Sequence, residues 1–201
     1  MNPALLAAAA LFTAAAAPTV MAQSHLIEGN ASSQVRVVIY EDLQCSDCAV
    51  FRKMLDEKLL PKYASKVAFE HRDFPLVKHA WAKRAAIASR FFQENRPEIA
   101  VLWRRETMAA QAQITPEKFA EHLTSFARKY GIDPAKATAA LFEKKYVDLV
   151  EKDYEEGVAR GIARTPTALV NGEPFVETFT LEEISKSIDA QLSALSGGPN
   201  K

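Results

Sequence analysis

Two cysteines that are separated by two residues, Cys45 and Cys48, are the only thiols in this chain of 201 residues. They follow a β-branched and aromatic run, Val35 to Tyr40, which is typical of a buried strand. They also open an apolar pattern of helical spacing that runs to about Leu60, with Pro61 after its end. A helix N-terminus offers unpaired N–H groups and partial positive charge, which lower the pKa of a thiol placed there. We therefore expect Cys45 to be a reactive thiolate and Cys48, one turn further on, to resolve a mixed disulfide formed at Cys45.

Two other uses of the cysteine pair remain open. A disulfide across two residues closes a very small loop, so it removes little entropy from the unfolded chain and would be a weak structural crosslink. A zinc site would need two further ligands. The histidines do not form the close sequence pair that such sites usually use, although two of them, His71 and His79, could approach in space; the others are His25 and His122. We expect no bound metal.

The pattern of elements along the chain predicts an α/β fold. Residues 23–33 are polar and are expected to form a loop, and Val67 to Arg72 is expected to form a second strand. The strand–helix–strand unit that results has the length of a right-handed parallel crossover. Residues from about 77 to 160 then show helical patterns only, and the charged run from Glu151 to Glu156 is expected to be a solvated helix face.

The α/β pattern resumes after this helical segment. Thr167 to Val170 predicts a short strand, Asn171-Gly172 a tight hairpin turn, and Glu173 to Glu177 the returning arm. Thr180 to Glu183 is a capping box that opens a last helix. The whole order predicts a four-stranded mixed sheet with helices on both faces and a helical insertion at about 77–160.

Composition and the N-terminus indicate an exported protein of one domain. Residues 5–17 are almost entirely Ala and Leu, and a small residue, Ala22, ends a motif for signal-peptide cleavage. We expect residues 1–22 to be a signal peptide and 23–201 the mature domain; an uncleaved anchor is the alternative. Lys plus Arg and Asp plus Glu are 25 each, so net charge gives no reason to expect nucleic acid as a partner.

Three segments resemble the DsbA-like branch of the thioredoxin superfamily, over about residues 35–191. They are Tyr40 to Cys48, His71 to Leu76 with His79 following, and Gly161 to Thr167 with the hairpin turn at 171–172. The resemblance implies a thioredoxin fold with an inserted helical subdomain, and disulfide exchange in the bacterial cell envelope.

The resemblance also implies roles for residues and partners. The Thr165–Pro166 bond would be cis, and this loop would bind an extended client chain beside the cysteines. No cofactor would be needed beyond the Cys45–Cys48 disulfide. The partners would be reduced or misoxidised client proteins and either a quinone-linked re-oxidant in the membrane or a reductant. No dimerisation domain is visible, so we expect a monomer in the periplasm or cell envelope.

Two departures from the family concern redox tuning. Many relatives have Pro where this chain has Ser46, and strong oxidants have His where it has Asp47. An anion at Asp47 should raise the pKa of Cys45 relative to a His there and make the protein a weaker oxidant. Relatives often keep a buried carboxylate six residues before the first cysteine, and this chain has Ile39. Glu41 lies on the same strand face and could substitute, although a solvent-exposed strand end is the interpretation we favour.

The sequence therefore favours an exported enzyme that donates disulfides to envelope proteins. A reductase or isomerase of the same compartment is the first alternative, because Asp47 weakens the case for a strong oxidant. A non-catalytic peptide-binding chaperone on this fold is the second alternative, and the retained cysteine pair speaks against it.

Overall fold

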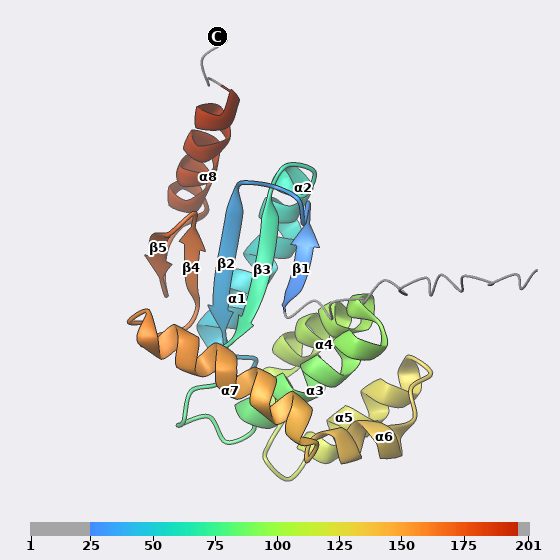
Figure 1. The fold of residues 1–201 in the computed structure, drawn as a ribbon. Helices are drawn as coiled ribbons and strands as arrows, with labels where there is room; N and C mark the ends of the chain where they lie inside the picture. Colours follow the sequence, from blue (N-terminus) through green and yellow to red (C-terminus); the bar gives the residue numbers. More distant parts are fainter. Residues whose placement is uncertain (1–24, 197–201) are drawn as a thin grey trace, which may run out of the picture.

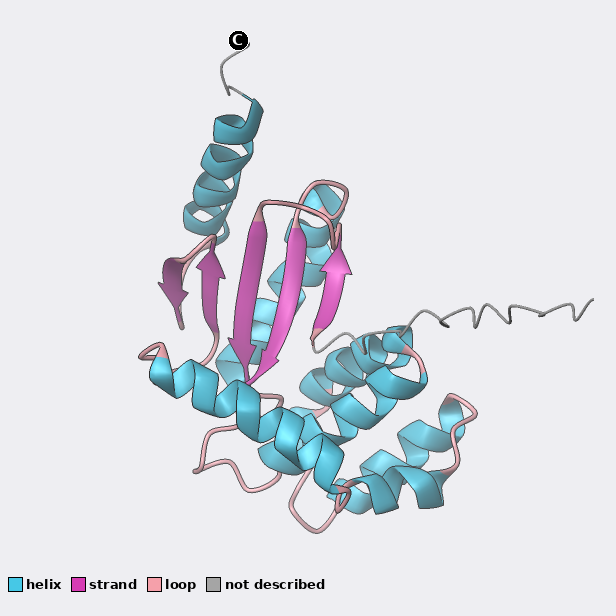
Figure 2. Cartoon of the chain, in the orientation of Figure 1, coloured by secondary structure: helices cyan, strands magenta, loops and turns pink. Residues whose placement is uncertain are grey.

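The computed structural model describes residues 25–196, in which a five-stranded mixed sheet is flanked by helices on both faces (Figure 1 and Figure 2). The strand order is β1-β3-β2-β4-β5. The central pair, β2 and β3, is parallel, and the other three pairs are antiparallel. The strands are β1 (Leu26–Gly29), β2 (Arg36–Glu41), β3 (Ala68–Asp73), β4 (Thr167–Val170) and β5 (Glu173–Val176). The expected signal peptide and its cleavage site lie outside the described residues.

The thioredoxin-type α/β class is confirmed, but the expected number of four strands is wrong. The additional strand, β1, falls in the segment we expected to be a loop. It pairs antiparallel with β3, with Leu26 opposite His71 and Gly29 opposite Ala68. Only four residues long, β1 carries too short an alternation to be recognised locally. Its strand geometry depends on burial of Leu26, which is 3% exposed, and on hydrogen bonds to β3.

One face of the sheet is covered by the helix that follows the cysteines and by the last helix, α8 (Leu181–Ser196). The first consists of α1 (Ser46–Met54), a π-helical turn (Leu55–Leu59) and α2 (Leu60–Tyr63). We expected this helix to end before Pro61, but it continues to Tyr63. The wider π turn, in which Leu60 N–H donates to Leu55 C=O, lies immediately before the proline. A proline near the start of a helical segment loses no hydrogen bond that the segment needs.

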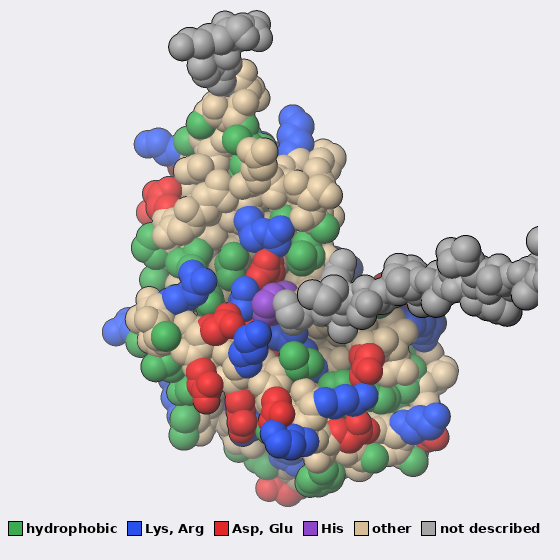
Figure 3. Space-filling model, in the orientation of Figure 1, with side chains coloured by type: hydrophobic (Ala, Val, Ile, Leu, Met, Phe, Trp, Pro, Cys, Tyr) green, Lys and Arg blue, Asp and Glu red, His purple; other side chains and the backbone are tan. Residues whose placement is uncertain are grey.

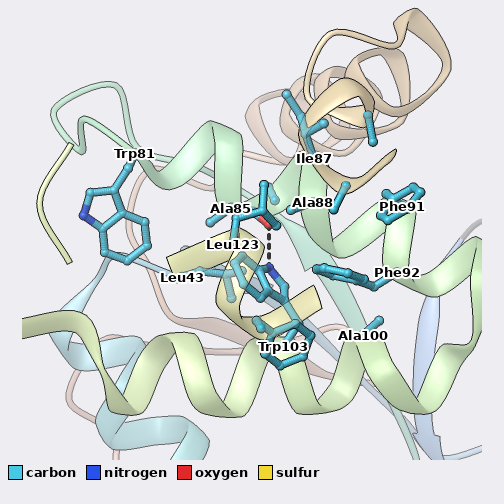
Figure 4. Packing of buried hydrophobic residues seen from close by; sticks show 14 of the residues in the cluster. Leu43, Trp81, Ala85, Ile87, Ala88, Phe91, Phe92, Ala100, Trp103 and Leu123 are labelled. Carbon is cyan, nitrogen blue, oxygen red and sulfur yellow. Dashed lines mark hydrogen bonds between the residues drawn. The ribbon is translucent and has the colours of Figure 1, made fainter. Parts of the chain in front are cut away.

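The helical segment expected at about 77–160 forms a block at the end of the sheet where β2 and β3 finish (Figure 1). Two tryptophans lie in its core: Trp103 is fully buried, and its Nε1–H donates to Ala85 C=O at 2.9 Å (Figure 4). The block therefore has a core of its own, which extends to Cys45 and Cys48. Its helices are α3 (Ala82–Asn95), α4 (Pro97–Ala109), the 3₁₀ turn Gln111–Gln113, α5 (Phe119–Lys129), α6 (Pro134–Ala140) and α7 (Lys144–Ala159).

Helix α7 lies across the end of the other face of the sheet, against β3 (Figure 1), and the burial of one of its side chains differs from what we expect. The charged run on α7 is not entirely a solvated face, because Asp153 is 1% exposed. Its carboxylate accepts from the backbone N–H of Asp73 at 2.9 Å and bonds to Arg90 and Arg72. A buried carboxylate is tolerated because these partners offset its desolvation. Asp153 thus fastens α7 to the end of β3.

The surface shown in Figure 3 carries acidic and basic side chains interspersed over α7 and the sheet, rather than a patch of one sign. This agrees with the balanced charge of the sequence. Within residues 25–196, none of the helices combines the length and apolar character needed to cross a membrane.

Candidate active site

Cys45 stands at the junction of the loop after β2 with α1. Its backbone is extended (φ −79°, ψ 126°), so it is the N-cap residue, and its N–H donates to Asp42 C=O at 3.0 Å. Both cysteines are free thiols: Cys45 is 7% exposed and Cys48 is fully buried. The expected arrangement, an outer cysteine at the helix N-terminus and an inner one a turn further on, is the arrangement in the structure.

The Cys45 thiol has a lowered pKa of about 5. The largest cause is a hydrogen bond from the Cys48 thiol to the Cys45 sulfur. Burial acts in the opposite direction, and the Thr165 side chain and the backbone N–H groups of Cys48 and Asp47 lower the pKa further. The Thr165 Oγ1 is buried and makes no hydrogen bond within residues 25–196, so its hydroxyl is available to the thiolate. At neutral pH Cys45 is therefore ionised, as a nucleophilic and leaving thiol should be.

The pKa of the Cys48 thiol is shifted in the opposite direction, upward. Burial raises its pKa well above the usual value, and the neighbouring Cys45 and the negative charge of Glu41 raise it further. The backbone N–H of Asp42, 3.4 Å from the Cys48 sulfur, acts in the other direction. The two cysteines are thus an unequal pair, a thiolate at Cys45 and a thiol at Cys48.

Glu41 is buried, which overturns the interpretation of an exposed strand end. It is 2% exposed, and its Oε1 accepts from His71 Nδ1 at 2.6 Å and from Arg104 Nη1 at 2.8 Å. Burial alone would raise the pKa of Glu41, but His71 and Arg104 outweigh burial and hold the pKa below its usual range. Glu41 is therefore a fixed anion close enough to Cys48 to influence it.

The partners of Glu41 extend into a network that the sequence did not reveal. His71 Nε2 lies 3.0 Å from Glu28 on β1, and Arg104 of α4 also bonds to Asp73 at 2.5 Å. Burial alone would lower the pKa of His71, yet Glu41 and Glu28 raise it. The sequence marks His71 as a possible zinc ligand and as the start of a family-like segment, but not as a partner of Glu41. Arg104 lies in a helix with nothing in its sequence to mark a site. The helical block thus supplies one of the cations that keep Glu41 charged.

The loop before β4 brings Thr165 and Pro166 to the cysteines from 120 residues away. The Thr165–Pro166 bond is cis, both residues are buried, and Cys45 Sγ lies 3.3 Å from Thr165 C=O. Pro166 C=O accepts from Glu177 N–H at 2.8 Å, which ties the loop to the residue that follows β5. The loop therefore contacts the reactive sulfur directly.

The two residues between the cysteines point outward. Ser46 and Asp47 are exposed. Asp47 contributes its backbone N–H to the Cys45 thiolate, while its side chain lines a groove of about 210 Å³ with Val50 and Phe179. Asp47, which we expect to tune the redox pair, is thus at the surface beside Cys45.

The helical block also holds the loop that carries Cys45, through one of its side chains and one of its backbone N–H groups. Gln111 Nε2 donates to Leu43 C=O at 2.8 Å and to Cys45 C=O at 2.9 Å, and Gln44 Oε1 accepts from Trp81 N–H at 2.8 Å. Sequence reasoning missed Gln111, because a glutamine in a turn carries no signal of such a contact.

His71 and His79, the pair that could have completed a zinc site, lie on carboxylates instead. His71 bonds to Glu41 and Glu28, and His79 Nδ1 lies 2.7 Å from Asp42. Across residues 25–196, no group of three or more His, Cys, Asp and Glu side chains is arranged to hold a metal ion.

Comparison with known proteins agrees with this geometry. A family model described as thioredoxin matches residues 21–190. The chain belongs to the thioredoxin family. Its fold is also similar to solved structures of the DsbA-like branch. Oxidised BdbD from Bacillus subtilis is 22% identical with a TM-score of 0.76, covering 85% of this chain and 94% of that one.

A second structure, the thiol–disulfide exchange protein alpha-DsbA2 from Wolbachia pipientis, is 18% identical with a TM-score of 0.72, covering 84% of this chain and 88% of that one. A curated relative is the Na(+)/H(+) antiporter NhaA of Herminiimonas arsenicoxydans, 26% identical over 164 residues, which are 82% of this chain. The chain spans a quarter of the length of that antiporter. The likeness thus concerns one portion of a longer protein.

Proposed function

We propose that this protein is a thiol–disulfide oxidoreductase in which Cys45 forms the mixed disulfide with client proteins. Cys48 is the leaving thiol when a disulfide is donated, and it resolves the mixed disulfide when a client disulfide is reduced. The observation that carries the proposal is the unequal pair. Cys45 has a pKa of about 5 and lies against the Thr165–Pro166 loop, while Cys48 is buried with a raised pKa. A structural crosslink would need neither an ionised outer thiol nor a protonated inner one.

The reaction in the disulfide-donating direction has two exchange steps. A client thiolate attacks Cys45 Sγ, the Cys45–Cys48 bond breaks, and Cys48 leaves as a thiolate that takes up a proton. A second client thiolate then attacks the client sulfur of the mixed disulfide and releases Cys45 as a thiolate. The client loses two electrons and gains a disulfide, and the Cys45–Cys48 pair gains those electrons. A low pKa makes Cys45 a good leaving group in the second step.

In this proposal, the proton taken up by Cys48 comes from the buried pair that Glu41 forms with His71. Its carboxylate disfavours a thiolate at Cys48, and His71, whose pKa is raised, is hydrogen-bonded to Glu41 at 2.6 Å. Glu41 thereby has the place of the carboxylate that relatives keep where this chain has Ile39. In a Glu41→Gln variant we expect the pKa of Cys48 to fall, so the alkaline limb of the exchange rate shifts to lower pH. An unchanged pH profile would exclude this role.

The direction that we favour is donation of disulfides. A thiolate stabilised at Cys45 makes the reduced form more favourable, and a protein whose reduced form is stabilised is an oxidant. This consideration outweighs the expected effect of Asp47, whose carboxylate is exposed and whose N–H group lowers the Cys45 pKa. Reduction or isomerisation of client disulfides is the alternative if the potential is low.

The cellular setting that we propose follows from the N-terminus and from the chemistry. Residues 1–22 have the composition of a cleaved signal peptide, and a disulfide-donating pair needs an oxidising compartment such as the periplasm. Reduced client proteins would be the substrates, and a quinone-linked membrane protein would restore the Cys45–Cys48 disulfide. We propose that the enzyme acts as a monomer, with no cofactor beyond this disulfide.

The experiment that tests the function is the reduction potential of the Cys45–Cys48 pair. Protein would be equilibrated in glutathione buffers of graded ratio, and free thiols would be trapped and counted. A potential well above that of the glutathione pool supports disulfide donation, and one well below it supports reduction. A Cys45→Ser variant should lose all exchange with a reduced client peptide. If the wild-type protein binds unfolded client peptides without exchanging disulfides, and Cys45→Ser binds them equally well, the non-catalytic chaperone is favoured instead.

A further inference from the structure

Asp42 lies between Glu41 and the cysteine loop, and its side chain gathers three segments of the chain. One oxygen, Oδ1, accepts from the backbone N–H of Gln44 at 2.7 Å. The other, Oδ2, accepts from the backbone N–H of Leu76 at 2.8 Å and from His79 Nδ1 at 2.7 Å. Asp42 is 1% exposed, so these bonds replace water. A single buried carboxylate thus joins the redox loop to the loop between β3 and α3.

The backbone of the same residue contacts both cysteines. Asp42 C=O accepts from Cys45 N–H at 3.0 Å, and Asp42 N–H points at Cys48 Sγ at 3.4 Å. The position of Asp42 therefore fixes where α1 begins and where the inner sulfur lies. The inner sulfur matters because its thiol makes the hydrogen bond that most lowers the Cys45 pKa.

We propose that Asp42 is the positioning residue of the Cys45–Cys48 pair and that His79 holds Asp42 in place. This inference rests on the proposed exchange function and assigns that function two residues outside the cysteine motif and the Thr165–Pro166 loop. Asp42 does not touch the client chain. It keeps the outer cysteine at the N-terminus of α1 and the inner thiol within reach of it.

The alternative to positioning is a direct effect of charge, and the two predict opposite signs. A carboxylate near a thiol raises the thiol pKa, so removing the charge of Asp42 would make Cys45 more acidic. If Asp42 acts by position, removing one of its contacts loosens the hydrogen bonds to the thiolate and makes Cys45 less acidic. An Asp42→Asn variant separates the two, because an amide can accept on one atom only and must lose either the Gln44 or the Leu76 contact.

His79 allows a milder test of the same idea, because its ring reaches the surface. The side chain is 19% exposed and lines a pocket of about 570 Å³ between the β3–α3 loop and α7, with Val77 and Tyr154 among its other walls. A substitution there leaves both backbone contacts of Asp42 intact. His79→Gln keeps an N–H donor for the carboxylate, whereas His79→Leu removes it.

The experiment measures the Cys45 pKa from thiolate absorbance and the equilibrium with glutathione in wild type, Asp42→Asn and the two His79 variants. For Asp42→Asn we expect about a tenfold fall in the ionisation constant of Cys45, because the variant loses one hydrogen bond near a charged group. The equilibrium with glutathione should shift toward the disulfide form by a similar factor. His79→Leu should move both quantities in the same direction by a smaller factor, and His79→Gln should restore them toward wild type.

Asp153→Asn is the matched control, because Asp153 is equally buried and also accepts a backbone N–H, from Asp73, but does not contact the cysteine loop. Its thermal stability should fall while the Cys45 pKa stays at the wild-type value. A lower or unchanged Cys45 pKa in Asp42→Asn, or equal values in His79→Leu and His79→Gln, would overturn the proposal. If Asp42→Asn does not fold, the His79 pair decides. Failure of wild type to exchange disulfides would instead refute the proposed function.

Discussion

The hydrogen bond from Cys48 to Cys45 can be tested by removing its donor. Because the Cys48 thiol is the largest cause of the Cys45 pKa of about 5, a Cys48→Ala variant should titrate at a higher pH. A hydrogen bond to a charged group contributes about 1.5–3 kcal/mol. Since one pKa unit corresponds to about 1.4 kcal/mol, the expected shift is about one to two units, to a pKa of about 6–7.

The shift should stop short of the usual thiol value, because other contacts remain. The Thr165 side chain and the backbone N–H of Asp47 still stabilise the thiolate, and α1 still begins at residue 46. The measurement is the ultraviolet absorbance of the thiolate against pH in reduced protein. Cys45→Ala is the control, and its remaining thiol, Cys48, should ionise only at alkaline pH. A pKa still near 5 in Cys48→Ala would refute the hydrogen-bond argument, and ionisation near 5 in Cys45→Ala would reverse the assignment of the two thiols.

Three further predictions follow from other features. The lowered Cys45 pKa stabilises the folded reduced protein at high pH, and this contribution is lost as pH falls through about 5. The free energy of unfolding of the reduced protein, minus that of the oxidised protein, should therefore decrease as pH falls; a difference that does not change with pH would contradict the prediction. Asp47→His places a cation beside Cys45 and should raise the reduction potential by about 30 mV, a tenfold change with glutathione; no rise would show that Asp47 does not tune the pair. Gly29→Ala should destabilise the fold by about 1–3 kcal/mol in denaturant unfolding, because Gly29 has φ +85° and its new Cβ would lie 2.4 Å from Val67 C=O; wild-type stability would show that β1 can shift freely.

Features decided by neighbouring residues were predictable from the sequence. Asn171 and Gly172 have positive φ values of 45° and 98°, as a tight hairpin turn requires. Thr180 and Glu183 exchange the two hydrogen bonds of a capping box. The cysteine motif at a strand-to-helix junction likewise predicted an outer thiolate, since the helix N-terminus that stabilises it is part of the same local pattern.

The sequence alone did not determine which polar side chains are buried. Glu41 was expected at an exposed strand end, and Asp153 in a solvated run, yet both are almost completely buried. A buried carboxylate is stable only where distant segments bring cations and N–H groups to it. For Glu41 these come from β3 and α4, and for Asp153 from β3 and α3.

The active site has a part that is local in sequence, the cysteine pair, and a part that folding assembles, the residues that set the two thiol pKa values. Residue types and spacing determined that Cys45 and Cys48 form a reactive pair, because a two-residue gap at a helix start is a local arrangement. The tertiary structure decided how unequal the pair is. Thr165 reaches Cys45 across 120 residues, and the anion that raises the Cys48 pKa depends on Arg104 in the helical block. Charge at a buried position is set by the groups that folding assembles around it, and no short stretch of sequence contains them.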